Sequence, residues 1–232
     1  YIYLARVYGA AAVGVFVLCN SGLDIVAKLG ILGFDRAIMT HGVRRTGAGD
    51  DTELYRVTAQ GLALASTAAV AVTLAVEAAL VPLSHGLLGR ADLAAPLRVM
   101  APGILFWTVS AVLLAAARAP RVMKNDLVVK SAVEPLVLFA AALALRPLLP
   151  GVRALAWAFL ASTFAGAVTA AALFARRHSF RRLAAAGGRA GRGELVRHAV
   201  PIGVYDLLNL LLQRVDLFVL NRFAPAAAVG VY

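Results

Sequence analysis

The sequence predicts an all-α, polytopic membrane protein, and three observations carry this prediction. Apolar residues make up 61% and charged residues 15% of the 232 residues, with a mean hydropathy of +0.81, whereas soluble domains are roughly half apolar and a quarter charged. Several apolar runs reach the ~20 residues that cross a bilayer as a helix. Runs such as 62–76 lack the alternation of polar and apolar residues found in transmembrane β-barrels.

An internal repeat indicates the domain organisation. Leu4–Phe16 and Leu220–Tyr232 are identical at eight of thirteen positions, with an offset of 216 residues. A period of this length suits a duplicated bundle of membrane helices. We therefore expect a first transmembrane bundle at 1–175 with a truncated first helix, a cytoplasmic Arg-rich linker at 176–197, and the start of a second bundle at 198–232.

Each apolar run is expected to form one helix, bounded by glycine or proline. Gly9 separates the end of the first helix from the second, and Pro201 is placed in the first turn of the seventh. Pro135 frees a backbone carbonyl in the fifth helix and invites a kink. Residues 82–96 are expected to form a loop. The expected helices cover residues 1–8, 11–35, 57–81, 97–118, 127–149, 154–175 and 199–220.

The distribution of positive charge predicts the orientation in the membrane. Fifteen of the 23 Lys and Arg residues lie in or beside the loops after the second, fourth and sixth helices, against six on the opposite side. The positive-inside rule places the richer side in the cytoplasm, which suits a multi-pass protein of the inner (cytoplasmic) membrane. The linker at 176–197 is expected to contact anionic lipid head groups. Nucleic-acid binding is not expected, because no stacking aromatics accompany the charge.

Two polar stripes run along expected membrane helices. In the second helix, Asn20, Asp24 and Lys28 share one face, and Asp24 is spaced to pair with Lys28. Ionisable groups at bilayer depth cost ~2.5–3.5 kcal/mol and therefore face protein or a wet cavity. The stripes are either self-neutralising structural pairs or the lining of a central cavity. The seventh helix carries Asp206, Asn209, Gln213 and Asp216 on its stripe, with Arg214 beside it.

Other polar residues give no sign of catalytic or metal chemistry. Asp126, Lys130 and Glu134 follow each other at four-residue spacing, typical of a salt-bridged helix start. Cys19 alone forms no internal disulfide framework and is expected to be a small buried residue. The four histidines share no spacing, and G-x-S-x-G, H-E-x-x-H and Walker A sequences are absent. We expect no enzyme, no metal site and no cofactor.

Four stretches resemble the Wzx-like, polysaccharide-biosynthesis branch of the multidrug/oligosaccharidyl-lipid/polysaccharide (MOP) exporter superfamily. Leu4–Phe16 is similar to the family's "LAR-x-G-x-x-x-x-G-x-F/Y" link between its first two helices. Leu32–Met39, LGFDRAIM, resembles the end of its second helix. Asp126–Pro135, DLVVKSAVEP, resembles its fifth-helix "E-P" segment, and Ala199–Tyr232 resembles its seventh helix.

This resemblance implies a MATE-like fold, in which two six-helix bundles enclose a cavity that opens alternately to either side. It also implies transport of a polyprenyl-diphosphate-linked oligosaccharide for surface polysaccharide synthesis. Cationic side chains suit the diphosphate, and Lys28, Arg36 and Arg214 are the candidate contacts. The two polar stripes would line the path or couple H⁺ or Na⁺.

Two rival functions remain open at this stage. In a cation-coupled multidrug exporter of the same superfamily, Asp24 or Asp216 would bind the coupling cation. In a non-transporting membrane component of a glycan assembly complex, neither polar stripe would be needed for transport.

Overall fold

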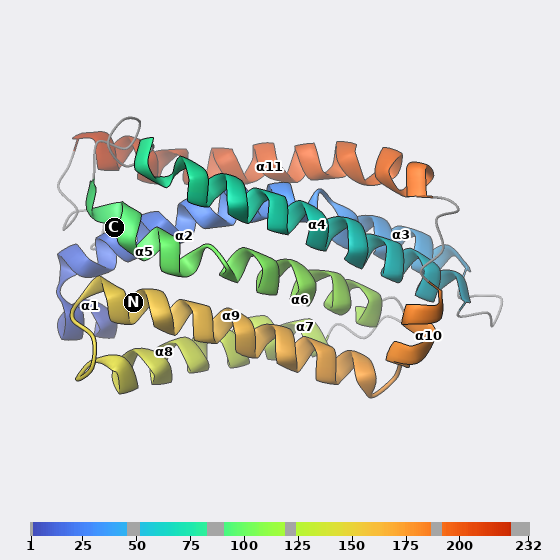
Figure 1. Ribbon diagram of the computed structural model, residues 1–232, viewed down its shortest axis with the longest axis horizontal. Coiled ribbons are helices and arrows are strands. Elements are labelled where there is room, and N and C mark those ends of the chain that lie inside the picture. The colour runs from blue at the N-terminus through green and yellow to red at the C-terminus, as the bar shows by residue number, and fades with distance from the viewer. Residues whose placement is uncertain (1, 46–51, 83–90, 119–123, 187–191, 224–232) are drawn as a thin grey trace.

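The computed structural model describes residues 2–45, 52–82, 91–118, 124–186 and 192–223, and the regular elements in these ranges are all helices (Figure 1). They are α1 (Ile2–Tyr8), α2 (Ala10–Ile31), α3 (Phe34–Arg45), α4 (Thr52–Pro82), the 3₁₀ turn η3 (Ala91–Leu93), α5 (Ala94–Met100), α6 (Gly103–Arg118), α7 (Lys124–Leu127), the π-helix η4 (Val128–Val133), α8 (Glu134–Leu145), α9 (Val152–Ala175), α10 (Phe180–Ala185) and α11 (Arg192–Phe223).

Six helical segments in the described part are long and apolar enough to cross a membrane. They correspond to the second to seventh expected helices, and α1 corresponds to the end of the first. The predicted class, an all-α polytopic membrane protein, is therefore confirmed. The six spans are Ala10–Ile31, Thr52–Leu80, Ala94–Ala117, Val128–Leu145, Val152–Ala175 and Gly193–Val215.

The long helices lie side by side in one bundle (Figure 1). α9 packs against both α6 and α8, α4 packs against α2 and α6, and α11 lies along α2 and α3. α3, α10 and the beginning of α11 lie at one end of the bundle, and α1 and α5 lie at the other (Figure 1). Arg-rich segments therefore share one end, as the charge pattern predicts.

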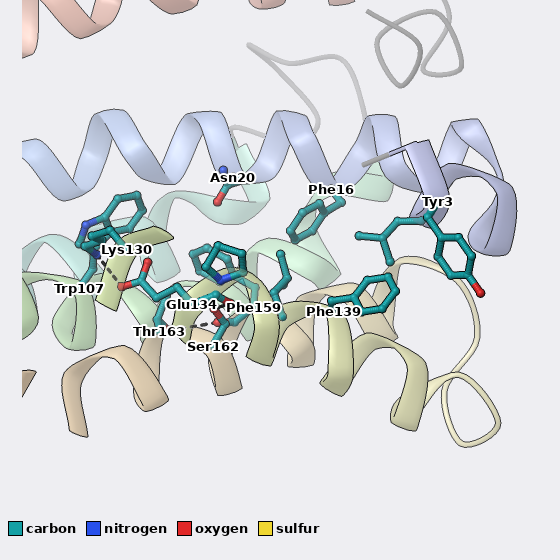
Figure 2. A pocket seen from close by; sticks show the side chains of 13 residues that line it. Tyr3, Phe16, Asn20, Trp107, Lys130, Glu134, Phe139, Phe159, Ser162 and Thr163 are labelled. Atoms are coloured by element: carbon teal, nitrogen blue, oxygen red, sulfur yellow. Dashed lines mark hydrogen bonds and ion pairs between the residues drawn. The ribbon is translucent and has the colours of Figure 1, made fainter. Parts of the chain in front are cut away.

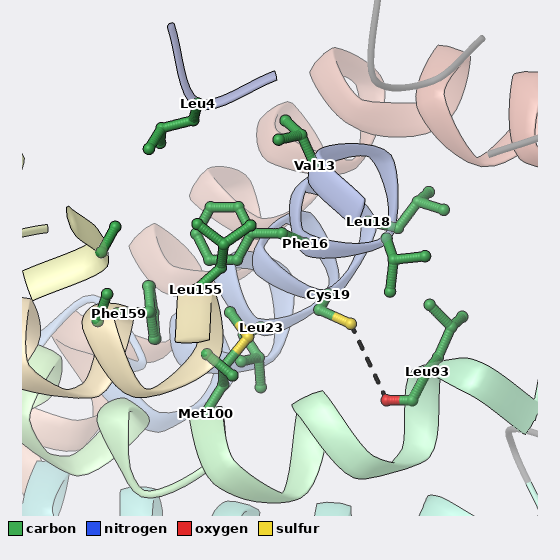
Figure 3. Packing of buried hydrophobic residues seen from close by; sticks show 14 of the residues in the cluster. Leu4, Val13, Phe16, Leu18, Cys19, Leu23, Leu93, Met100, Leu155 and Phe159 are labelled. Carbon is green, nitrogen blue, oxygen red and sulfur yellow. Dashed lines mark hydrogen bonds between the residues drawn. The ribbon is translucent and has the colours of Figure 1, made fainter. Parts of the chain in front are cut away.

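Two apolar clusters hold the bundle together. In the first, Phe16 of α2 meets Phe159 of α9 edge to face, with ring centroids 6.4 Å apart (Figure 3). Cys19 belongs to this cluster, and its Sγ donates to the carbonyl oxygen of Leu93 at 3.9 Å. The prediction of a small buried residue is confirmed for Cys19. The second cluster, at the Arg-rich end, includes Phe34 of α3 and joins α3 to α4, α6 and α9.

The single helix expected at 11–35 is divided in two. α2 ends at Ile31, and Leu32 (φ 49°) and Gly33 (φ 74°) both take a left-handed backbone conformation before α3 begins. The Leu32 N–H donates to the Lys28 carbonyl oxygen at 3.0 Å and closes α2. The prediction was wrong here because a leucine side chain normally disfavours this conformation. Packing of Phe34 into the second cluster stabilises the start of α3 beyond the break.

Two further boundaries differ from expectation. The loop predicted at 82–96 is partly helical, since η3 and the start of α5 lie within it. α11 begins at Arg192, so Pro201 lies inside the helix and not in its first turn. Leu195 and Ala199 are buried in the second cluster. Their packing stabilises helical turns before Pro201, although proline removes one helical hydrogen bond.

Candidate functional site

Two ion pairs join α11 to α2 and α3, and α11 provides the base of one and the acid of the other. Arg214 Nη2 donates to Asp24 Oδ2 of α2 at 2.8 Å. Arg36 Nη2 of α3 lies 2.9 Å from Asp206 Oδ1 of α11. The carboxylate side chains of Asp24 and Asp206 are 10% and 6% exposed, while those of Arg214 and Arg36 are 34% and 55% exposed. The interface therefore shelters its acids and leaves its guanidinium groups accessible.

A direct backbone contact accompanies these ion pairs. A Cβ at Gly33 would lie 2.5 Å from the Ala199 carbonyl oxygen, and a Cβ at Gly203 would lie 2.6 Å from the Leu32 carbonyl carbon. Small residues allow two membrane helices to approach this closely. The glycine pair therefore fixes where α11 touches the break between α2 and α3.

The predicted pair between Asp24 and Lys28 is wrong, because Asp24 binds Arg214 of α11 instead. Lys28 is half-buried one turn along α2 and acts on Asp24 electrostatically, but it is not the ion-pair partner. A pair on one helix surface contributes only a few tenths of a kcal/mol. Arg214 of α11 therefore takes the place of Lys28 as the partner of the sheltered Asp24 carboxylate. Asp24 Oδ1 is buried without a hydrogen-bond partner among the described residues.

The predicted polar stripe on α11 is partly buried and partly exposed. Asp206 faces α3, but Asn209 and Gln213 are exposed, with Gln213 Nε2 donating to Asn209 Oδ1 at 3.5 Å. The side chain of Asp216 lies outside the described residues. Four of the nine predicted site residues thus meet at one interface: Asp24, Arg36, Asp206 and Arg214.

A cavity of about 360 Å³ lies between α1, α2, α6, η4, α8 and α9. Figure 2 shows Lys130, Glu134 and Trp107 at one end of it, and Tyr3 and Phe139 at the other. Asn20 reaches toward it from α2, and it is the one predicted site residue in the described lining. The cavity therefore has a polar end and an aromatic, apolar end.

The polar end is formed by an ion pair against an aromatic ring. Lys130 Nζ lies 2.6 Å from Glu134 Oε1 and 4.8 Å from the ring centroid of Trp107, within reach of a cation–π interaction. The four-residue spacing predicted a salt-bridged helix start, and the Lys130–Glu134 pair confirms the salt bridge. The pair also lines a cavity, because α1, α2 and α9 enclose that part of the helix.

The local backbone explains how this pair is positioned. The π-helix η4 directly precedes Glu134 and Pro135, and proline interrupts the regular hydrogen-bond ladder. A π-helical segment therefore lies directly before Pro135, and the kink expected at Pro135 stays a prediction. Ser162 Oγ of α9 donates to the Glu134 carbonyl oxygen at 2.8 Å. A Cβ at Gly166 would lie only 2.6 Å from Glu134 Oε1, so glycine leaves room for the carboxylate.

Comparison with known proteins gives the family. A family model described as "Polysaccharide biosynthesis protein" matches residues 1–232. The chain belongs to this family. The resemblance of its four sequence stretches is thereby confirmed at the level of the family. No curated protein and no solved structure matches the chain.

This member of the polysaccharide biosynthesis family is a multi-pass membrane protein embedded in a lipid bilayer. The contacts of α11 with α2 and α3 carry two arginines, Arg214 and Arg36, and a guanidinium group binds phosphate oxygens through paired, charge-assisted hydrogen bonds. Within the described ranges, no group of three or more His, Cys, Asp or Glu residues is placed to hold a metal ion. Arg214 and Arg36 can bind an anion at this interface in competition with the carboxylates of Asp24 and Asp206.

Sequence reasoning did not include Trp107, Lys130, Glu134 or Ser162 among the candidate site residues. The signal that could have found Lys130 and Glu134 is their four-residue spacing directly before Pro135, which marks a charged pair at a helix irregularity.

Proposed function

We propose that the protein is a transporter that flips a polyprenyl-diphosphate-linked oligosaccharide across the cytoplasmic membrane by alternating access. In this proposal Lys28, Arg36 and Arg214 bind the diphosphate. The polar residues that line the path or couple H⁺ or Na⁺ are Asn20, Asp24, Asp206, Asn209, Gln213 and Asp216. The protein carries out no bond-making chemistry of its own, and residues 176–197 contact anionic lipid.

The observation that carries this proposal is the exposure of two arginines at the contacts of α11, Arg214 within a membrane-spanning helix and Arg36 just beyond the end of α2. Charges at bilayer depth are costly and mark pathways for polar substrates. Arg36 and Arg214 have side chains 55% and 34% exposed although each has a carboxylate partner. Their free guanidinium faces can therefore receive an anionic group. The anion we propose is a lipid-linked diphosphate, which is consistent with a role in polysaccharide biosynthesis.

The decisive experiment measures leaflet translocation of a fluorescent polyprenyl-diphosphate sugar by the full-length protein in liposomes. We expect Arg36→Gln and Arg214→Gln each to reduce the rate about tenfold or more, since a hydrogen bond to a charged group contributes ~1.5–3 kcal/mol. The matched control is Arg98→Gln, because Arg98 is exposed and pairs with Glu77 at 3.4 Å, away from the α2–α11 interface. Unchanged translocation in both arginine variants contradicts the proposal.

A cation-coupled exporter is the second candidate, and the buried Asp24 favours it. Asp24 Oδ1 has no hydrogen-bond partner in the described chain and could accept a cation. Neutralising Lys28 and Arg214 separates the two candidates. A flippase should lose translocation, whereas an exporter of cationic compounds should retain efflux, measured with a fluorescent cation in the same liposomes.

A further inference from the structure

The two ion pairs between α11 and α2–α3 are single contacts that a better ligand can replace. Each described pair joins one guanidinium nitrogen to one carboxylate oxygen, Arg214 to Asp24 and Arg36 to Asp206. Arginine reaches its full strength with two parallel hydrogen bonds to a carboxylate or a phosphate. Each arginine therefore retains donors for an incoming anion.

Exposure decides which partner a ligand meets first. The arginine side chains are accessible, but Asp24 and Asp206 lie behind them at 10% and 6% exposure. An anion can reach the guanidinium groups before either carboxylate moves. Arg36 has the more exposed side chain, 55% against 34% for Arg214, and is the first contact.

We infer that a diphosphate group displaces Asp206 from Arg36 and then displaces Asp24 from Arg214. This exchange of partners loosens α11 from α2 and α3. This inference rests on the proposed function. While the two ion pairs are formed, their carboxylates repel a nearby diphosphate. Once the ion pairs break, all the hydrogen-bond donors of both guanidinium groups become available to the diphosphate. It thus binds the separated state more tightly, which is the condition for a ligand to shift a conformational equilibrium.

The remaining contacts of the interface allow such a separation. The backbone of α11 approaches the break between α2 and α3 at a glycine pair, Gly33 and Gly203, while Leu195 and Ala199 at the start of α11 stay packed in the second cluster. Lys28 lies four residues beyond Asp24 on the same helix, so a positive charge remains one turn from the Asp24 carboxylate when Arg214 leaves. The glycine contact serves as the pivot, and the ion pairs determine whether the interface is closed.

The test measures the separation of α2 and α11 in the full-length protein by electron spin resonance. Spin labels are placed at Leu29→Cys and Leu208→Cys, which are exposed positions on the two helices, in a Cys19→Ala background. In neutral-lipid nanodiscs, we expect farnesyl diphosphate to shift the distance distribution outward by about 5 Å, comparable to one helical turn. Farnesol, which lacks the diphosphate, should cause no shift.

Further arms identify the source of the anion and the role of the carboxylates. Inorganic pyrophosphate tests whether the diphosphate alone suffices, and phosphatidylglycerol in the nanodisc tests whether a lipid head group does the same. Asp24→Asn with Asp206→Asn should give the long distance without ligand. The exchanged pair Arg36→Asp with Asp206→Arg should restore the short distance but respond less to farnesyl diphosphate, because its arginine is now at the sheltered position.

The outcomes separate this inference from the proposed function. If farnesyl diphosphate binds and translocation proceeds but the distance stays short, the exchange is refuted and the flippase stands. An outward shift caused equally by farnesol also refutes the exchange. If farnesyl diphosphate does not bind and no translocation occurs, both proposals fail.

Discussion

At the scale of single residues, Gly33 and Gly203 determine how closely α11 approaches the break between α2 and α3. Both positions face backbone atoms of the other segment, which cannot move aside as the end of a flexible side chain could. Gly33 is constrained further by its positive φ of 74°. A side chain at either position therefore has to push α11 away from the interface.

Gly203→Ala should destabilise the protein by about 1–3 kcal/mol, the usual cost of overpacking, because its Cβ would lie 2.6 Å from the Leu32 carbonyl carbon. The control is Gly22→Ala in α2, where a Cβ would meet nothing within 4 Å. The control should be neutral or up to about 1 kcal/mol stabilising, because alanine favours the helix. Thermal unfolding in detergent measures both variants. Equal melting temperatures for the two variants would rule out the close contact.

At the scale of helical elements, a hydrogen bond from α9 supports the irregular segment around Pro135. Ser162 Oγ donates to the Glu134 carbonyl oxygen, next to the π-helix η4. Single π-turns within α-helices occur frequently at functional sites. Here the irregularity lies where Lys130 and Glu134 line the cavity (Figure 2), so the bond from α9 helps to hold both groups in place.

Ser162→Ala should cost about 0.5–1.5 kcal/mol of stability, because it removes a hydrogen bond between two helices. Ser110→Ala is the matched control. Ser110 is also buried, but its Oγ donates to the carbonyl oxygen of Trp107 in the same helix. Such bonds within a helix contribute little. Denaturant unfolding of both variants checks the difference, and an equal loss from each would argue against the support from α9.

At the scale of the whole molecule, the helices alternate in direction and bring the Arg-rich segments to one end of the bundle (Figure 1). Leu148 lies between α8 and α9, and Arg177 follows α9. These exposed positions therefore lie at opposite ends of α9. The positive-inside rule assigns Arg177 to the cytoplasmic side and Leu148 to the other.

Cysteine labelling of the full-length protein tests this orientation. In a Cys19→Ala background, a membrane-impermeant maleimide should label Leu148→Cys on intact cells, and Arg177→Cys only after permeabilisation. The accessibility ratio between the two variants is the measurement. The reverse pattern would mean that the Arg-rich end faces outward.

The sequence was sufficient to place the membrane spans but not the partners of their charges. The spans follow from long apolar runs, which the bilayer requires regardless of how the helices pack. Asp24 and Arg214 are 190 residues apart, and their meeting depends on the rotation and depth of two helices. The break at Leu32 was equally hidden, because tertiary packing imposes it on a residue that does not favour it. The repeat at 220–232 remains a prediction, since residues 224–232 lie outside the described part.

The break at Leu32 has a consequence for the depth of the two arginines. α2 has 22 residues and is therefore about 33 Å long, close to the ~30 Å thickness of the hydrocarbon layer. Arg36, just beyond the break, is then level with the phosphates of the surrounding lipids. Asp24 and its partner Arg214 lie roughly 10 Å further inward. A phosphorylated head group following this route would leave the lipid surface in two successive steps, from a shallow binding station to a deep one, with its hydrocarbon tail still in the leaflet.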